Sequence, residues 1–439
     1  MNLETNKIIS IIKSNKSGKN SGIASLCSAN SFVLKAAINF AKENDTLLLI
    51  EATSNQVNQF GGYTGCTPSD FRNNLFRYSK DLGYPTENIL LGGDHLGPNA
   101  WQSCNAKEAM KNSQDLISAY VSAGFYKIHL DASMKCADDG DKNVPLSPSI
   151  IAERTAMLCR AAENAYTISG KPDSKPVYVI GTDVPIPGGM KIEREDIRIT
   201  TADDVQETID LTKAAFERYD LKNVWERVIA VVVQPGVEFG DTNVVEYQSS
   251  KVRELAQKIA TYENIVYEAH STDYQTKENL RKMVGDHFAI LKVGPWLTYA
   301  FREAVFAMEF IEKEYLSRKK DVVLSYIMET IDQAMDDDPG YWEKYYSGSS
   351  EKMNFAKKYS YSDRIRYYWI NSMIYTSLDH LIKNLSHYEI PLTLLSQFMP
   401  DEYQAIRDGR IKNSPEELIY HKISHVLNIY KYATTEEIN

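Results

Sequence analysis

Short apolar runs recur between residues 22 and 293, and a stretch of helical character separates each run from the next. Most runs are unbroken rather than alternating, which is typical of strands buried on both faces. An open, doubly wound sheet would use the same kind of strand. The number of runs, eight, favours a closed barrel over an open sheet. The pattern predicts an α/β fold in which eight parallel strands close into a (β/α)8 TIM barrel. The predicted strands are Gly22–Cys27, Leu47–Glu51, Ile89–His95, Tyr126–Asp131, Val177–Asp183, Val228–Gln234, Ile265–His270 and Phe288–Val293.

The strand signals stop after residue 320. Helical patterns follow at Val322–Met335 and Asp363–Asn384, and Asp336–Gly340 breaks the chain between them. We therefore expect residues 1–320 to form the barrel with a short N-terminal helix, and residues 321–439 to form a helical C-terminal extension. The tyrosine-rich extension could pack on its own barrel or on another subunit of a homo-oligomer, and we favour the barrel.

Composition excludes several classes of function. The 439 residues carry a net charge of −10 and are 43% hydrophobic, so the chain can build a sizeable core. No basic stripe is longer than Arg318–Lys320, and we expect no nucleic-acid partner. No apolar run approaches the roughly 20 residues that cross a bilayer, and Met1–Glu4 lacks the apolar core of a secretion signal, so a cytoplasmic protein without membrane contact is expected. The five cysteines include no close pair, which indicates reduced, mostly structural thiols.

Nearly every predicted strand ends in a polar residue, and in TIM barrels the active site lies at the carboxyl ends of the strands. These side chains should therefore gather at one rim. The strand-end candidates are Glu51, Asp94, His95, Asp131, Asp183, Gln234, Glu268 and His270.

Two motifs carry the candidate metal ligands. In Gly92–Pro98, the glycines allow tight packing, and the imidazole of His95 suits a metal while Asp94 suits proton transfer. Glu268 and His270 lie two residues apart on a strand and so point to the same side, where His270 could complete a metal site with His95. The alternative is that both histidines are satisfied structural residues.

Three more residues belong near this rim. Asp183 precedes a Pro- and Gly-rich loop that would hold it as a third metal ligand. His129 and Asp131 share a strand face; Asp131 is nearer the mouth and is the better candidate for proton transfer, whereas a core role is favoured for the deeper His129.

Substrate contacts are expected from loops. Asn55 and Gln56 lie in an amide-rich strand exit, and amides both donate to and accept from sugar hydroxyls. A solvated loop is the alternative.

A phosphate is expected at the loops after the seventh and eighth strands. Ser271 and Thr272 follow the seventh strand, and Gly294 opens a helix whose N-terminal amides can attract an anion. Lys292 and Arg302 are the nearest cations. No Gly-x-x-x-x-Gly-Lys-Ser/Thr sequence occurs, which argues against a P-loop kinase.

Four motifs in order resemble the GatZ/KbaZ family, the large subunits associated with D-tagatose-1,6-bisphosphate aldolase. The motifs are Ile50–Gly65, Gly92–Asn99, Val184–Gly189 and Glu268–Gln275. Some members of that family act as ketose-6-phosphate 4-epimerases, and others are thought only to stabilise a separate aldolase subunit. The family resembles class II aldolases, which implies a barrel and, in catalytic members, a divalent metal, here expected to be Zn²⁺.

The resemblance also marks departures. Asp183 stands where family members often have Glu. Class II aldolases usually offer a histidine after the sixth strand, where this chain has Gln234. The expected metal ligands are therefore His95, Asp183 and His270, with help from the weaker ligand Gln234.

Two functions follow as hypotheses. The first is a metal-dependent enzyme of tagatose and galactitol metabolism that opens the C3–C4 bond of a ketohexose phosphate, with Asp94, Asp131 and Glu51 as the catalytic candidates. Re-addition of the aldehyde fragment on its other face gives 4-epimerisation, and its release gives aldol cleavage. The second is a non-catalytic subunit that stabilises a class II aldolase partner through its C-terminal region. We expect Glu268 to be one of the substrate-binding residues. The polar residues at the strand ends favour the enzyme over the non-catalytic subunit.

Overall fold

Eight parallel strands close into a barrel in the computed structural model, which describes residues 3–141, 144–170, 175–181 and 197–436. The predicted α/β barrel is confirmed, and each predicted apolar run overlaps one of its strands, although β2 and β3 extend past the predicted ends to Thr53 and Leu96. Around the barrel the strand order is β1-β10-β9-β6-β5-β4-β3-β2. The strands are β1 (Ile23–Cys27), β2 (Leu48–Thr53), β3 (Ile89–Leu96), β4 (Lys127–Leu130), β5 (Val177–Ile180), β6 (Val228–Val233), β9 (Val266–Ala269) and β10 (Ile290–Val293).

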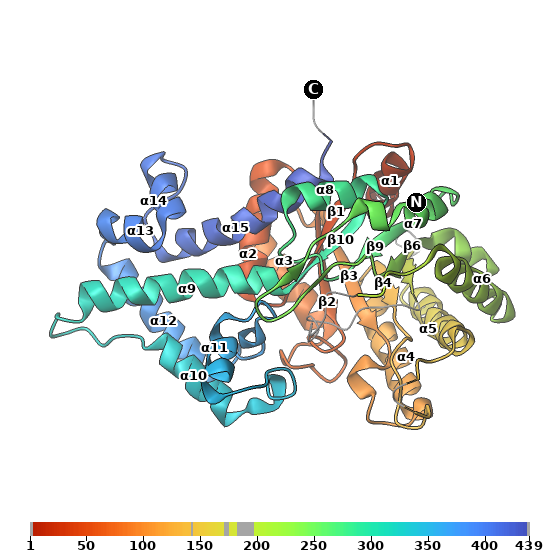
Figure 1. The fold of residues 1–439 in the computed structure, drawn as a ribbon, viewed down its shortest axis with the longest axis horizontal. Helices are drawn as coiled ribbons and strands as arrows, with labels where there is room; N and C mark the ends of the chain where they lie inside the picture. The colour runs from red at the N-terminus through yellow and green to blue at the C-terminus, as the bar shows by residue number, and fades with distance from the viewer. Residues whose placement is uncertain (1–2, 142–143, 171–174, 182–196, 437–439) are drawn as a thin grey trace.

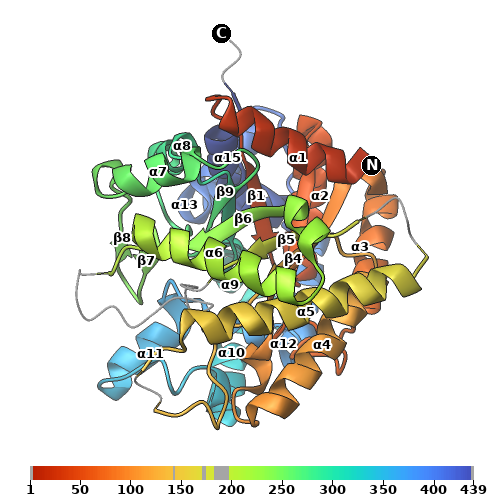
Figure 2. The same cartoon turned by 90° about the vertical axis from the view of Figure 1, so that its right-hand side faces the viewer.

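Helix α1 (Leu3–Lys16) covers the end of the barrel at which the strands begin (Figures 1 and 2). Its Ile8 and Ile12 are buried in one cluster with Ile23, Leu49 and Ile290 from three strands. Because this cluster fills the end of the barrel at which the strands begin, the cavity described below lies at the opposite end, where the strands finish.

Helices connect successive strands and begin at residues that favour helix starts. Thr67 and Thr201 each form a capping box with the aspartate three residues further on, and Ser147 caps the helix that begins at Pro148. The barrel helices are α2 (Ser31–Asn44), α3 (Pro68–Leu82), α4 (Ala106–Ser122), α5 (Pro148–Ile168), α6 (Ala202–Arg218), α7 (Arg253–Ala260), α8 (Lys277–Gly285) and α9 (Pro295–Leu316).

Short elements complete the barrel. A two-stranded antiparallel sheet, β7 (Glu238–Phe239) and β8 (Val244–Val245), follows β6. The 3₁₀ turns are η1 (Thr86–Asn88), η2 (Pro98–Trp101), η3 (Lys222–Arg227) and η4 (Ser249–Lys251). All five cysteines are free thiols. Among the described residues, no helix combines the length and apolar character needed to cross a bilayer.

In the described chain after residue 320, every regular element is an α-helix or a 3₁₀ turn. These elements flank the long helix α9 on both sides (Figure 1). Helix α15 returns to the barrel, packs against α2, α8 and α9, and ends where Gly22 N donates to Thr434 O at 3.0 Å. The elements are α10 (Ile327–Asp337), η5 (Pro339–Tyr341), α11 (Ser350–Tyr359), η6 (Arg364–Tyr367), α12 (Ser372–His387), α13 (Leu392–Phe398), α14 (Pro400–Arg407) and α15 (Pro415–Thr434).

The helix predicted over Asp363–Asn384 is divided in the structure. Asp363 has a φ of 43° and η6 follows it, while α12 begins only after Asn371, whose side chain accepts from Met373 N. An asparagine cap within an apolar stretch starts a new helix because it satisfies the first free backbone amides. The division of the chain at residue 320 stays a prediction.

Candidate active site

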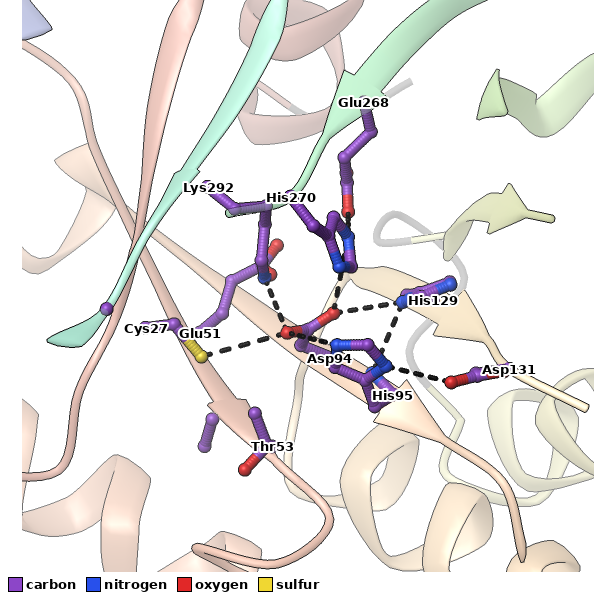
Figure 3. Close-up of polar contacts among 12 residues, drawn as sticks. Cys27, Glu51, Thr53, Asp94, His95, His129, Asp131, Glu268, His270 and Lys292 are labelled. Carbon is purple, nitrogen blue, oxygen red and sulfur yellow. Dashed lines mark hydrogen bonds and ion pairs between the residues drawn. The ribbon is translucent and has the colours of Figure 1, made fainter. Parts of the chain in front are cut away.

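Asp94 lies at the centre of a polar cluster where the strands end (Figure 3). Strand β3 places it beside Thr53 of β2, and its side chain is 2% exposed. Its Oδ2 lies 2.9 Å from Lys292 Nζ on β10, and its Oδ1 lies 2.9 Å from His129 Nδ1 on β4. Burial alone would raise the pKa of Asp94, but the charges of His95, Lys292 and His270 outweigh burial and hold the pKa well below its usual value. Asp94 is therefore a carboxylate.

Two histidines at the rim are each held by a buried carboxylate. His95 Nδ1 lies 2.8 Å from Asp131 Oδ2, and His270 Nε2 lies 3.0 Å from Glu268 Oε1. The two imidazole rings are 4.8 Å apart and nearly perpendicular. Histidines that bind metals usually donate the other ring N–H to a carboxylate in this manner. If each histidine donates to its carboxylate, the second nitrogen of each ring is left with a lone pair.

The expected proximity of His95 and His270 is therefore present, and their donor chemistry fits a divalent cation. His95 Nε2 lies 3.7 Å from Asp94 Oδ2, which is beyond hydrogen-bond distance, and the hydrogen bond of His270 to Glu268 uses its Nε2 rather than its Nδ1. Both side chains line the cavity at the barrel mouth. Imidazole nitrogens oriented by carboxylates suit zinc.

A second set of atoms in the same cluster could also hold a metal. Asp94, His129, Glu268 and His270 each offer a ligand atom, and these atoms lie within 4.8 Å of one another. His129 Nε2 is buried without a hydrogen-bond partner among the described residues, which leaves it available as a ligand. This set lies deeper, however, because neither His129 nor Glu268 lines the cavity.

Two buried lysines balance the acids below the rim. Lys127 Nζ lies 2.6 Å from Glu51 Oε1 and 2.7 Å from Glu268 Oε2, while Lys292 pairs with the other oxygen of Glu51. Glu51 is fully buried between the two ammonium groups and does not line the cavity. Its geometry suits charge balance rather than contact with a substrate.

Asp131 contacts His95 and does not line the cavity. It is fully buried, and its Oδ1 accepts from the backbone and the hydroxyl of Ser133 at 3.0 and 2.6 Å. Burial lowers the pKa of His95, but the negative charges of Asp94 and Asp131 raise this pKa by more than burial lowers it. The net shift of the pKa is therefore upward. His95 has a φ of 48°, in the left-handed region that residues other than glycine seldom adopt.

A cavity of about 120 Å³ opens above this cluster. The expected residues that line it are Asn55, Gln56, Asp94, His95, His270, Ser271, Lys292 and Gly294. The strands thus bring together most of the residues that the sequence singled out.

Other expected residues point elsewhere. Gln234 Oε1 accepts from the amides of Gly236 and Val237 at 2.8 and 3.1 Å, so the glutamine folds onto its own loop. Thr272 donates to Lys292 O, and Arg302 lies flat over the Tyr299 ring at 4.0 Å. None of these three side chains lines the cavity. Asp183 and the loop Val184–Gly189 lie outside the described residues.

The amides at the start of α9, where we expected an anion, already have a partner. Gly294 N and Trp296 N donate to Asp273 Oδ1 at 3.0 and 2.8 Å. A carboxylate in the chain itself therefore occupies the position foreseen for a phosphate. Burial raises the pKa of Asp273 to about 6, against the opposing effect of these amides.

Three functional candidates were not found from the sequence. Lys127 and His129 lie two residues apart on β4 and share a face, a signal that could have identified Lys127. Arg366 and Tyr367 line the cavity from η6, beyond the barrel. No local pattern marks them, because η6 is a short 3₁₀ turn that reaches the cavity only through tertiary packing.

A further histidine pair lies on α15. His421 and His425 are near Glu402 of α14, and their ligand atoms could also approach a metal. His421 is satisfied without one, however, because its Nδ1 lies 3.0 Å from Glu402 Oε1 and its Nε2 faces the guanidinium of Arg410 at 3.4 Å. The cluster at the barrel mouth is therefore the candidate centre.

Comparison with known proteins gives one family and one close structural relative. The sequence model of the family described as D-tagatose-1,6-bisphosphate aldolase subunit GatZ/KbaZ-like matches residues 8–435, which confirms the resemblance of the four motifs. A probable tagatose 6 phosphate kinase from Sinorhizobium meliloti 1021 is 40% identical with a TM-score of 0.85, covering 94% of this chain and 100% of that one. A fructose-bisphosphate aldolase from Campylobacter jejuni is 14% identical with a TM-score of 0.46, covering 87% and 91%.

Proposed function

The chain belongs to the GatZ/KbaZ-like family of D-tagatose-1,6-bisphosphate aldolase subunits, and on this basis we propose that it is a metal-dependent enzyme acting on a ketohexose phosphate. The observation that carries the proposal is the pair of cavity-lining histidines, His95 and His270, each oriented by a buried carboxylate. The proposed reaction opens the C3–C4 bond. Re-addition of the aldehyde fragment on its other face converts tagatose 6-phosphate into fructose 6-phosphate, whereas release of the fragment from a bisphosphate is aldol cleavage.

We assign His95 and His270 as ligands of a divalent cation, expected to be zinc, with Asp183 retained as the third predicted ligand. A bound zinc ion would polarise the ketone and the hydroxyl beside it. Gln234 is not retained, because its carboxamide oxygen already accepts two backbone hydrogen bonds. The deeper set with His129 is the competing assignment.

Asp94 is the proposed base for the C4 hydroxyl. It lines the cavity and stays ionised, so it can accept the hydroxyl proton while the electrons of the C3–C4 bond move toward the C2 carbonyl. Lys292, 2.9 Å from Asp94 Oδ2, offers positive charge beside the reacting atoms. Asp131 positions His95, and Glu51 holds the two lysines in place.

The sugar hydroxyls are assigned to the cavity-lining amides of Asn55 and Gln56 and to Ser271. The second candidate function is a stabilising subunit for a separate aldolase, which the description of the family as an aldolase subunit favours. A barrel with that role alone has no need of a charged cluster that opens into a cavity.

The test is turnover by the purified chain. Zinc-loaded protein should interconvert tagatose 6-phosphate and fructose 6-phosphate, or cleave tagatose 1,6-bisphosphate, and a chelator should abolish the reaction. His95→Gln and His270→Gln should lose bound zinc and activity together. Full activity of metal-free protein, or no turnover without an added aldolase subunit that co-purifies with the chain, would refute the proposal.

The same measurement separates the two ligand sets. His129→Gln should keep its zinc if the ion lies between His95 and His270. If His129→Gln loses zinc while His95→Gln retains it, the deeper set holds the metal.

A further inference from the structure

Arg366 brings a cation to the cavity without a carboxylate partner. Its Nη1 donates to the main-chain oxygens of Ser362 and Asp363, its Nη2 donates to Tyr367 Oη at 2.9 Å, and it rests over the Tyr367 ring at 4.5 Å. Among the described residues, no Asp or Glu oxygen lies within 4 Å of its guanidinium. Its hydrogen-bond acceptors are two main-chain carbonyl oxygens and a phenol oxygen.

Two other arginines with little exposure are paired with acids. Arg154 meets Asp139 at 2.6 Å, and Arg227 meets Glu163 at 2.5 Å. A cation that leaves bulk water without such a partner is costly, and the cost is recovered when an anion binds. Arg302 and Arg364 also lack an acid within the described chain, but each guanidinium lies over a tyrosine ring and neither residue lines the cavity.

The acids that influence Arg366 are already engaged. Asp273 accepts the amides at the start of α9, and Asp363 accepts from the hydroxyl of Thr298. Lys292, which also lines the cavity, is paired with Glu51 and Asp94. Within the described part of the cavity, Arg366 is thus the cation whose charge is not balanced by an acid.

We propose that Arg366 binds the phosphate group of the ketohexose phosphate, an assignment that rests on the proposed function, and that η6 thereby completes the active site from outside the barrel. A guanidinium recognises phosphate oxygens by charge-assisted, often bidentate, hydrogen bonds. The aromatic contacts of its neighbour fix its position: the Tyr367 ring packs on Tyr63, from the loop after β2, and on Tyr341, each at 4.8 Å. The site is therefore organised before the substrate arrives.

Binding measured by calorimetry tests the assignment. Fructose 6-phosphate, fructose 1,6-bisphosphate and fructose are titrated into the zinc-loaded full chain and into Arg366→Gln, Arg366→Lys and the control Arg318→Gln, which removes a charge from the exposed turn after α9. Arg366→Gln should bind the phosphorylated sugars about 10- to 100-fold more weakly and fructose unchanged. Arg366→Lys should lie between, and the control should match the wild type. Arg366→Lys keeps the charge and serves if Arg366→Gln does not fold.

Equal affinity of the wild-type protein for fructose and its phosphates, or unchanged phosphate affinity in both Arg366 variants, would overturn the assignment. These results are separable from the proposed function. Phosphate binding through Arg366 with no turnover would leave the binding site standing and remove the enzyme. Turnover with an unaltered KM for tagatose 6-phosphate in Arg366→Gln would support the enzyme and overturn the phosphate site at Arg366.

Discussion

Buried carboxylates decide how the histidines at the barrel mouth present their ring nitrogens. Asp131 Oδ2 accepts from His95 at 2.8 Å, and the remaining oxygen of Asp131 is held by Ser133. The carboxylate thus fixes both the tautomer and the orientation of the imidazole, since a ring nitrogen that donates to Asp131 leaves the other with its lone pair.

Asp131→Asn should therefore weaken zinc binding about 10- to 100-fold, because an amide holds the imidazole less firmly and can favour the wrong tautomer. Competition with a chromogenic chelator measures this affinity. Ser133→Ala is the matched control, since it removes one hydrogen bond to Asp131 and leaves the contact with His95 intact, and it should change zinc affinity little. Equal zinc affinity in Asp131→Asn and the wild type would contradict the role assigned to Asp131.

Glu238 gives a second prediction, on pH. Its side chain is 0% exposed, and burial raises its pKa from 4.5 to about 7, against the lowering effects of the Phe239 amide and the Ser271 hydroxyl. A raised carboxyl pKa means that the folded state binds the proton more tightly. The stabilisation is complete below about pH 4.5 and is lost as the pH rises through about 7.

Glu238→Gln, which stays neutral, should gain stability relative to the wild type by on the order of 2–3 kcal/mol between pH 5 and pH 8. Urea unfolding at several pH values measures the difference. Glu246→Gln, at an exposed position following β8, controls for removal of one negative charge. A constant difference between Glu238→Gln and the wild type across this range would rule out the upward shift.

At the scale of elements, the turn after β3 depends on one glycine. A Cβ at Gly97 would lie 1.6 Å from Asp131 O, so any side chain there must push β3 and the end of β4 apart. Gly97→Ala should destabilise the fold by about 3 kcal/mol or more and loosen the His95–Asp131 contact. Chemical unfolding measures the loss of stability, and zinc affinity reports the loosened His95–Asp131 contact. Gly285→Ala, whose Cβ would meet its nearest neighbour at 3.4 Å, should cost far less; similar losses in both variants would contradict the argument.

The same scale shows what could be predicted from the sequence. Strands such as β6 (Val228–Val233) are buried on both faces, so they appear as unbroken apolar runs, and their closed order follows from parallel strands joined by helices. Strand ends share one rim, which is why Asp94, His95 and His270 could be grouped in advance. Gln234 was expected as a weak metal ligand, but its side chain turns onto its own loop, and Arg366 was not identified because it comes from a short 3₁₀ turn beyond the barrel.

For the whole molecule, the barrel and the chain after residue 320 share one hydrophobic core. The same cluster contains Leu26 of β1, Phe301 of α9, Ile374 of α12 and Ile423 of α15. A continuous core predicts that both parts unfold together in one cooperative transition. Two separate transitions would instead divide the chain near residue 320 into independent domains.

Ile423→Ala tests this coupling, since Ile423 is 0% exposed on the helix that returns to the barrel. The truncation should lower the free energy of unfolding by about 2–5 kcal/mol and should lower the midpoint of a single calorimetric transition. Release of bound zinc from the barrel mouth should occur at the same midpoint. Asn428→Ala, at an exposed position of the same helix, should leave that transition unchanged. If zinc release keeps the midpoint of the wild type while part of the helical signal is lost at a lower temperature, the C-terminal region unfolds alone. In that case Arg366 would leave the cavity before the barrel opens, and binding of fructose 6-phosphate should fall at the lower midpoint.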